Sequence, residues 1–444
     1  MSAQPVGAFL KVDRALGSTR ERAALGRRIL LLALLPALDA IINQINTAFQ
    51  ITIGSLSMLQ AFRGTLLLVL VFMIACTPRP RRASRFAIGG AMLCLLICIS
   101  VMAINQAVTG GGVELGDLIT YVQMGYWITV WYAAQSWIRD ASDARKVLNG
   151  LMAGALVTAA SVCYGYIVGV DNSVYEAAGV KASSGFFVSG KGIAGALVVG
   201  GITAAYLGMA RRTWRHPCAA VFCFGACFLT YARAGLVALC ASLFWLLIWS
   251  TFFQARSGGS WARRVIAVSI LGAAMLIAAI GVTDLTRRWS DLKDPNRAGS
   301  GRLEIWTFAA ESFDEANFSQ RLAGRGYQGM VNFINSKLGV EIHTHNDVLD
   351  MLVMGGMVGI GLLLLVVAAL GAQILSTPAQ SPEFAAAISI LLTFFCQAIL
   401  TGQLFMPDVM SYYVMGITAL LVSTAPVMFS RVQFAQAPGF RPAL

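Results

Sequence analysis

The stretch "EIHTHNDVLD" contains two of the three histidines in the 444-residue chain, His343 and His345, and leads directly into a long apolar run. A neutral imidazole can accept a proton from a hydroxyl near neutral pH, and histidine is the commonest general base. His345 is the better candidate because it adjoins Asn346 and Asp347. Capping or loop hydrogen bonding is the competing interpretation. Metal ligation is less well supported, because no third ligand stands near the His-X-His pair.

Two arginines stand where apolar sequence is interrupted, Arg233 in "LTYARAGLVAL" and Arg302 in "GSGRLEIW". The guanidinium group is always charged, and its planar set of donors matches the oxygens of a phosphate. Together with His345, two such groups would suit a site for a lipid-linked diphosphate. Each arginine also has a simpler interpretation: Arg233 can extend to lipid phosphates from the end of a span, and Arg302 can be a solvated residue or part of a loop ion pair.

Three further charged residues are weaker candidates for the same site. Arg63 in "LQAFRGTLLL" could reach the outer head-group region of a membrane. Arg325 lies between two glycines in "GRGY", where a tight turn is expected, and a solvated or head-group-facing loop is its favoured interpretation. Asp408 in "LFMPDVM" could orient a catalytic group or hold an arginine, although helix capping is its favoured role.

Other carboxylates form pairs at i,i+3 spacing, Asp291 with Asp294 and Asp347 with Asp350. This spacing suits helix starts and solvated faces, and neither pair is a convincing site for a divalent cation. We therefore expect that arginine and histidine, without a metal, carry the chemistry.

These residues must be positioned by membrane-spanning helices. The chain is 57% apolar and only 12% charged, which predicts an all-α polytopic membrane protein. Most of the 33 Lys and Arg residues lie in short clusters between apolar runs, so the net charge of +12 indicates topology and not nucleic-acid binding. About twelve spans are predicted, near residues 29–48, 58–77, 87–106, 118–137, 147–169, 189–210, 218–232, 234–254, 265–283, 347–374, 384–403 and 411–429.

The basic clusters predict that both termini are cytoplasmic. The expected organisation is a cytoplasmic tail at 1–28, nine transmembrane helices over 29–283, a long external loop at 284–346, three further helices over 347–429 and a cytoplasmic tail at 430–444. The loop holds most of the basic residues that the positive-inside bias does not explain, and it is expected to be an ordered lid.

Two helical features of this region follow from residue spacing. In "GRLEIWTFAAES", Leu303, Trp306 and Ala310 recur at i, i+3 and i+7, which predicts an amphipathic helix lying on the membrane surface. In "GGMVGIG", Gly355 and Gly359 have the spacing that lets membrane helices approach closely. This would lock the helix after His345 against a neighbour.

The order of these landmarks resembles a known family. His345-Asn346, a nine-residue gap and the pair Gly356 and Gly359 resemble the signature of the O-antigen ligases. "TYARAGL" is similar to the arginine turn of that family, and "SGRLEIW" and "GRGY" are similar to landmarks of its long loop. The chain departs from the pattern at Ala232, where the family usually has serine before the arginine.

The resemblance implies a fold similar to the membrane-embedded glycosyltransferases that use lipid-linked sugars, in the bacterial inner membrane. It implies transfer of a preassembled O-antigen from undecaprenyl diphosphate to a sugar hydroxyl of the lipid A core, at a site facing the periplasm. The donor is already activated, so neither nucleotide nor other cofactor is expected. The partners are the lipid-linked donor, the lipid A core oligosaccharide and membrane lipids, with no nucleic acid.

In this interpretation Arg233 and Arg302 bind the diphosphate, His345 is the base, and His343 is a loop residue close to it. Three alternatives remain. An O-antigen polymerase and a protein O-oligosaccharyltransferase would use the same donor chemistry with another acceptor. A non-enzymatic transporter of lipid-linked glycans is less well supported, because its polar residues are expected near the middle of the bilayer.

Overall fold

A computed structural model describes the chain in segments: residues 19–53, 56–76, 96, 99–100, 102–103, 115–169, 185, 190–253, 260–280, 302–339 and 343–435. Most of the span expected near 87–106, the Asp291 and Asp294 pair, and parts of both tails and of the external loop lie outside the described residues.

The described residues are almost entirely helical. The first group of helices is α2 (Thr19–Phe49), α3 (Met58–Ala75), α5 (Leu115–Trp137), α6 (Ala141–Val168), α8 (Gly190–Arg211), α9 (Arg215–Leu229), α10 (Arg233–Phe252) and α11 (Ser260–Ile280). The loop region holds α14 (Arg302–Asp314), α15 (Phe318–Ala323) and α16 (Gly326–Leu338), and the last group is α17 (Asp347–Leu375), α18 (Pro382–Leu400) and α19 (Pro407–Ala435). The two-residue strands β1 (Thr52–Ile53) and β2 (Leu56–Ser57) form a small antiparallel hairpin.

Six helices of the described chain are long and apolar enough to cross a membrane: Met58–Ala75, Ala141–Val168, Gly192–Arg211, Arg233–Phe252, Asp347–Leu375 and Pro382–Leu400. The expectation of a helical multi-pass membrane protein is confirmed at this level. The count of about twelve spans stays a prediction, although each expected span that falls on described residues coincides with a helix.

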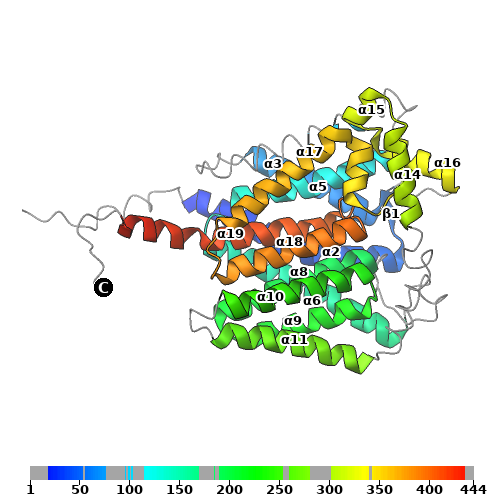
Figure 1. The fold of residues 1–444 in the computed structure, drawn as a ribbon. Coiled ribbons are helices and arrows are strands. Elements are labelled where there is room, and N and C mark those ends of the chain that lie inside the picture. Colours follow the sequence, from blue (N-terminus) through cyan, green and yellow to red (C-terminus); the bar gives the residue numbers. More distant parts are fainter. Residues whose placement is uncertain are drawn as a thin grey trace, which may run out of the picture.

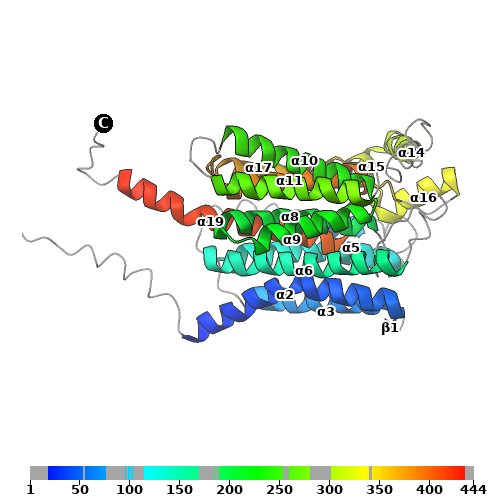
Figure 2. The ribbon, with the colours of Figure 1, turned by 90° about the horizontal axis from the view of Figure 1, so that it is seen from below.

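The long helices run side by side, as both ribbon views show (Figure 1, Figure 2). Helices α14, α15 and α16 gather at one end of this bundle, called here the loop-helix end. Helix α2 begins, and α19 ends, at the opposite end. The loop residues are therefore kept away from the described ends of the chain.

Helix α8 is the centre of the bundle and is packed by α6, α9, α10, α18 and α19. Its residues are buried all round, as expected of a helix that is apolar on every face. The start of α10 lies close against it, because a Cβ at Gly235 would lie 2.5 Å from the Cβ of Ala194. This contact fixes the position of the arginine that opens α10.

Helix α17 is broken at Gly356, which differs from the expectation of one continuous helix. Gly356 has φ 60° and ψ −158°, and a Cβ there would lie 2.6 Å from the carbonyl oxygens of Arg321 and Leu322. Glycine is required because it tolerates positive φ and leaves room for the backbone of α15. The kink thus packs against a loop helix, while Gly359 is buried in the second half of α17.

Helix α14 confirms that this stretch is helical. Its buried residues are Ile305, Ala309 and Ser312, whereas Leu303 is 59% exposed. Trp306 is half-buried. The predicted stripe includes the exposed residues Leu303 and Ala310, and its contact with a membrane surface stays a prediction.

Candidate active site

The two histidines of the central motif lie in the short segment that enters α17. Asn346 is the N-cap of α17, and its side-chain oxygen accepts hydrogen bonds from the backbone nitrogens of Val348 and Leu349. His345 precedes this cap with φ 55°, in the left-handed region that few residues other than glycine adopt. The helix start therefore holds the His345 backbone in a fixed, uncommon conformation.

Asp350 lies in the first turn of α17, one of the two positions that its spacing suggested, and it is buried beneath this segment. Its Oδ1 accepts hydrogen bonds from the backbone nitrogen of Thr344 at 3.0 Å and from the Thr344 hydroxyl at 2.7 Å. Its Oδ2 lies 3.2 Å from Nδ1 of His343. The side chain has no exposed surface, so these partners satisfy a carboxylate that would otherwise be costly to bury.

The imidazole rings of His343 and His345 lie edge to face, with centroids 4.2 Å apart and planes inclined by 65°. The backbone N–H of His345 also donates to Nδ1 of His343 at 3.2 Å. Both residues are half-buried. The structure therefore brings the two histidines into direct contact.

Asp347 fastens the histidine segment to the connection between α18 and α19. It accepts hydrogen bonds from the backbone nitrogens of Gln403 at 2.8 Å and Leu404 at 3.0 Å. Gly402 has φ 68°, and a Cβ there would lie 3.4 Å from atoms of Asp347 and of both histidines. Residues 401–406 thus form one wall of the site.

Arg302 opens α14 and reaches this wall. Its guanidinium Nη1 donates a hydrogen bond to the carbonyl oxygen of Leu400, at the end of α18. In the next turn, Trp306 Nε1 donates to the carbonyl oxygen of Thr344 at 2.9 Å. Helix α14 therefore contacts both the end of α18 and the histidine segment, and it brings Arg302 to the site.

Arg233 is the first residue of α10 and is half-buried. Tyr231 has φ 49° in the tight turn before it, and Ala232 is an N-cap without a side-chain hydrogen bond. A Cβ at Gly235 would lie 3.5 Å from Nε2 of Gln397 on α18. The start of α10 and the end of α18 therefore lie side by side, so Arg233 and Arg302 both belong to the surroundings of the end of α18.

A buried polar chain connects this side of the site to Asp347. The hydroxyl of Thr401 donates to Oε1 of Gln397 at 2.8 Å, and Nε2 of Gln403 donates to the Thr401 hydroxyl at 2.8 Å. All three side chains are essentially fully buried. Sequence reasoning missed these residues, although polar residues at the end of an apolar span are a recognisable signal.

Arg325 lies where the loop between α15 and α16 meets the kink of α17. The glycines on either side of it have positive φ, which confirms the expected tight turn. Its backbone nitrogen donates to the carbonyl oxygen of Val353 at 2.9 Å, and its Nε is buried without a hydrogen-bond partner among the described residues.

Aromatic rings connect α16 to the histidine segment. The ring centroid of Tyr327 lies 5.4 Å from that of Phe405, which lies 5.5 Å from that of His343.

Arg63 is placed differently from the other arginines. Its Nε and Nη2 both lie 2.9 Å from the carboxylate of Asp39, and Nη2 lies 3.6 Å from Asp408. Arg63 is only 8% exposed. Asp408 thus lies beside an arginine and also in the first turn of α19, so the arginine-holding and helix-start roles are both compatible with its position. Asp39 is a partner of Arg63 that the sequence did not suggest.

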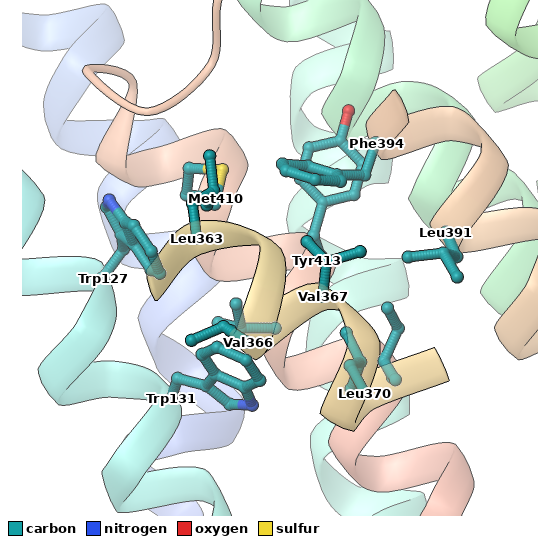
Figure 3. A pocket seen from close by; sticks show the side chains of 12 residues that line it. Trp127, Trp131, Leu363, Val366, Val367, Leu370, Leu391, Phe394, Met410 and Tyr413 are labelled. Carbon is teal, nitrogen blue, oxygen red and sulfur yellow. The ribbon is translucent and has the colours of Figure 1, made fainter. Parts of the chain in front are cut away.

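A small apolar cavity, open on one side, lies between α5, α17, α18 and α19. Figure 3 shows Trp127 and Trp131 of α5 on one side of it and Leu391 and Phe394 of α18 on the other. The indole nitrogen of Trp127 donates to the carbonyl oxygen of Leu404 at 3.1 Å. The cavity therefore begins beside the 401–406 wall of the site.

The fold and the site define a multi-pass membrane protein with arginines and paired histidines at one end of its helices. Residues 218–364 match the O-antigen ligase family, which confirms the resemblance of the sequence motifs. The matched segment includes Arg233, Arg302, Arg325 and both histidines of the site. At the level of class, the match supports a membrane glycosyltransferase of the O-antigen ligase or polymerase type. A comparison with curated proteins gives no match to the chain.

Proposed function

We propose that this protein is an O-antigen ligase. It transfers a preassembled O-antigen from undecaprenyl diphosphate to a sugar hydroxyl of the lipid A core, at the periplasmic face of the bacterial inner membrane. The observation that carries the proposal is the meeting of Arg302, the start of α10 and the two histidines around the end of α18, inside the family-matched segment.

The donor diphosphate is bound by Arg233 and Arg302, whose guanidinium groups offer paired donors to phosphate oxygens. Arg325 is a third contact, supported by a buried Nε that lacks a partner among the described residues. Arg63 is a weaker candidate for a diphosphate contact than its sequence position suggested, because the carboxylates of Asp39 and Asp408 already face its guanidinium. In this scheme Asp408 holds Arg63 and does not touch the donor.

The apolar cavity suits part of the isoprenoid chain of the donor. Its lining is entirely apolar carbon and sulfur surface on four helices, and ligand sites for apolar groups have this character. Because it begins beside the 401–406 wall, a chain lying in it would leave its diphosphate near the histidines.

Transfer is a single displacement. The acceptor hydroxyl gives its proton to the imidazole of His345 while its oxygen bonds to the anomeric carbon of the donor. The bond from that carbon to the phosphate oxygen breaks, its electron pair leaves with the diphosphate, and the configuration inverts. The arginines stabilise the charge that develops on the leaving oxygen. No nucleotide is required, because the diphosphate is already a good leaving group.

An O-antigen polymerase or a protein O-oligosaccharyltransferase would use the same donor and differ in the acceptor hydroxyl. A transporter of lipid-linked glycans is disfavoured, because the histidines and Arg302 lie at helix ends and in connections. Transporters are expected to place polar groups near the middle of the bilayer.

The direct test is His345→Ala. We expect transfer to be abolished while the protein stays folded in the membrane, because the acceptor hydroxyl loses its base. The control is His216→Ala, which removes the third histidine, at the start of α9, and should leave turnover close to wild type. Near-normal turnover of His345→Ala in a detergent-solubilised assay would remove His345 from the proposed role.

A further inference from the structure

We propose that Asp350 and His343 form a positioning pair that acts through His345. Asp350 holds the ring of His343, and His343 holds the ring and backbone of His345 and stabilises the positive charge that His345 acquires with the acceptor proton. This inference rests on the proposed function, and it adds two residues to the proton-accepting machinery.

The first support is the way the oxygens of Asp350 are divided. Thr344 supplies both hydrogen bonds to Oδ1, from its backbone nitrogen and its hydroxyl, and Oδ2 faces His343. A fully buried carboxylate must be neutralised or hydrogen-bonded at both oxygens. Because Thr344 binds only Oδ1, Oδ2 can interact with the imidazole of His343.

The second support is the double contact of His343 Nδ1, which lies 3.2 Å from Asp350 Oδ2 and 3.2 Å from the backbone nitrogen of His345. A ring nitrogen carries either a proton or a lone pair. With a proton, Nδ1 donates to Asp350; without one, it accepts from the His345 N–H. The proton position on His343 is thus tied to the backbone that carries His345.

The third support is the conformation of His345. A non-glycine residue with φ 55° is in a strained backbone conformation, which the surrounding structure must offset. The hydrogen bond from the His345 backbone N–H to Nδ1 of His343 and the ring contact at 4.2 Å are two of the interactions that do so. A carboxylate that orients one imidazole can therefore orient the second through it.

Neighbouring elements bring further charged and titratable groups to the pair. Helix α17 brings Asp347, which accepts backbone hydrogen bonds from residues 403 and 404. Helix α14 brings Arg302, which donates to the carbonyl oxygen of Leu400. Helix α16 brings Tyr327, separated from His343 by Phe405. Asp350 is distinguished from these groups by its direct contact with the ring.

The test is the pH profile of transfer by Asp350→Asn. We expect kcat to fall about 10- to 100-fold with KM for the donor nearly unchanged, because a misoriented base loses part of the usual gain from proton transfer. The pH at which kcat reaches half its maximum should move to lower values. The variant lacks the negative charge of Asp350, which through His343 stabilises the protonated form of His345. Asp314→Asn, an exposed carboxylate at the end of α14, should change neither quantity.

A double-variant cycle separates a positioning role from simple loss of structure. His343→Gln leaves the two Thr344 hydrogen bonds of Asp350 in place, so it is the variant to use if Asp350→Asn folds poorly. If Asp350 acts through His343, the two substitutions disturb the same interaction. The variant that carries both Asp350→Asn and His343→Gln should then transfer no more slowly than the slower of the two single variants. The proposal would be overturned if the rate losses of the two single variants multiply in the double variant. It would also be overturned if the rate of transfer by Asp350→Asn falls by the same factor at every pH.

The same assay distinguishes this inference from the proposed function. Wild-type transfer that His345→Ala abolishes supports the function, and Asp350→Asn or His343→Gln with a wild-type pH profile then refutes the positioning pair alone. Wild-type protein that makes no product, or a fully active His345→Ala, refutes the proposed function and the pair together.

Discussion

At the residue scale, the arginines separate by their partners. Arg63 is neutralised by Asp39 and Asp408 inside the bundle, whereas Arg302 donates to the main-chain carbonyl of Leu400 beside the histidine segment. A guanidinium group beside the histidines offers the paired donors that an anionic diphosphate binds. We therefore expect the two arginine environments to respond differently to substitution.

The conservative substitutions Arg233→Lys and Arg302→Lys keep the charge but remove the planar fork of donors. We expect each to lower the initial rate of transfer by about 10- to 100-fold, because bidentate phosphate binding is lost. Arg145→Lys is the matched control, since Arg145 is an exposed residue of α6 that donates to its own helix. Unchanged rates for both site variants would remove these arginines from diphosphate binding.

Sequence reasoning found the histidines because the chain has only three, and the arginines because they interrupt apolar runs. It missed Asp350, Asp347 and Asp39, because the partners of each become visible only after folding. Asp347 binds backbone groups 56 and 57 residues away, and Asp39 binds a side chain 24 residues away. Spacing alone made Asp347 and Asp350 resemble an ordinary helix start, and nothing in the sequence singled out Asp39.

At the element scale, the kink of α17 determines where the loop helices meet the membrane helices. Gly356 at the kink and Gly324 in the turn after α15 both have positive φ, and a Cβ at either would overlap the opposing backbone. The position of Arg325 follows from this contact, because it donates to α17 directly after Gly324. The helices were predictable from hydropathy, but the kink was not, because it depends on packing between segments distant in sequence.

Gly356→Ala tests the kink. We expect it to cost about 2–5 kcal/mol of stability and to lower transfer, because the new Cβ adds strain at positive φ and overlaps the backbone of α15. Gly361→Ala on the same helix is the control, since a Cβ there meets no atom within 4 Å, and its effect should be small. Thermal unfolding and transfer rates should be compared for both. Equal behaviour of the two variants would show that the kink is not needed.

At the scale of the whole molecule, the apolar bundle positions a polar site at its loop-helix end (Figure 1). Four helices line a small, open apolar cavity that begins beside this site, so a lipid-linked donor can have part of its chain among helices and its diphosphate at their ends. The general architecture was predictable from composition. The cavity was not, because it depends on how α17 lies relative to α5 and α19.

The central claim is tested most directly by purified protein supplied with undecaprenyl-diphosphate-linked O-antigen and lipid A core, without nucleotide and in the presence of EDTA. The account predicts that glycan appears covalently attached to the lipid A core, because the donor is activated and the arginines neutralise its diphosphate. Glycan joined instead to a second lipid-linked glycan, or a strict requirement for Mg²⁺ or Mn²⁺, would contradict it.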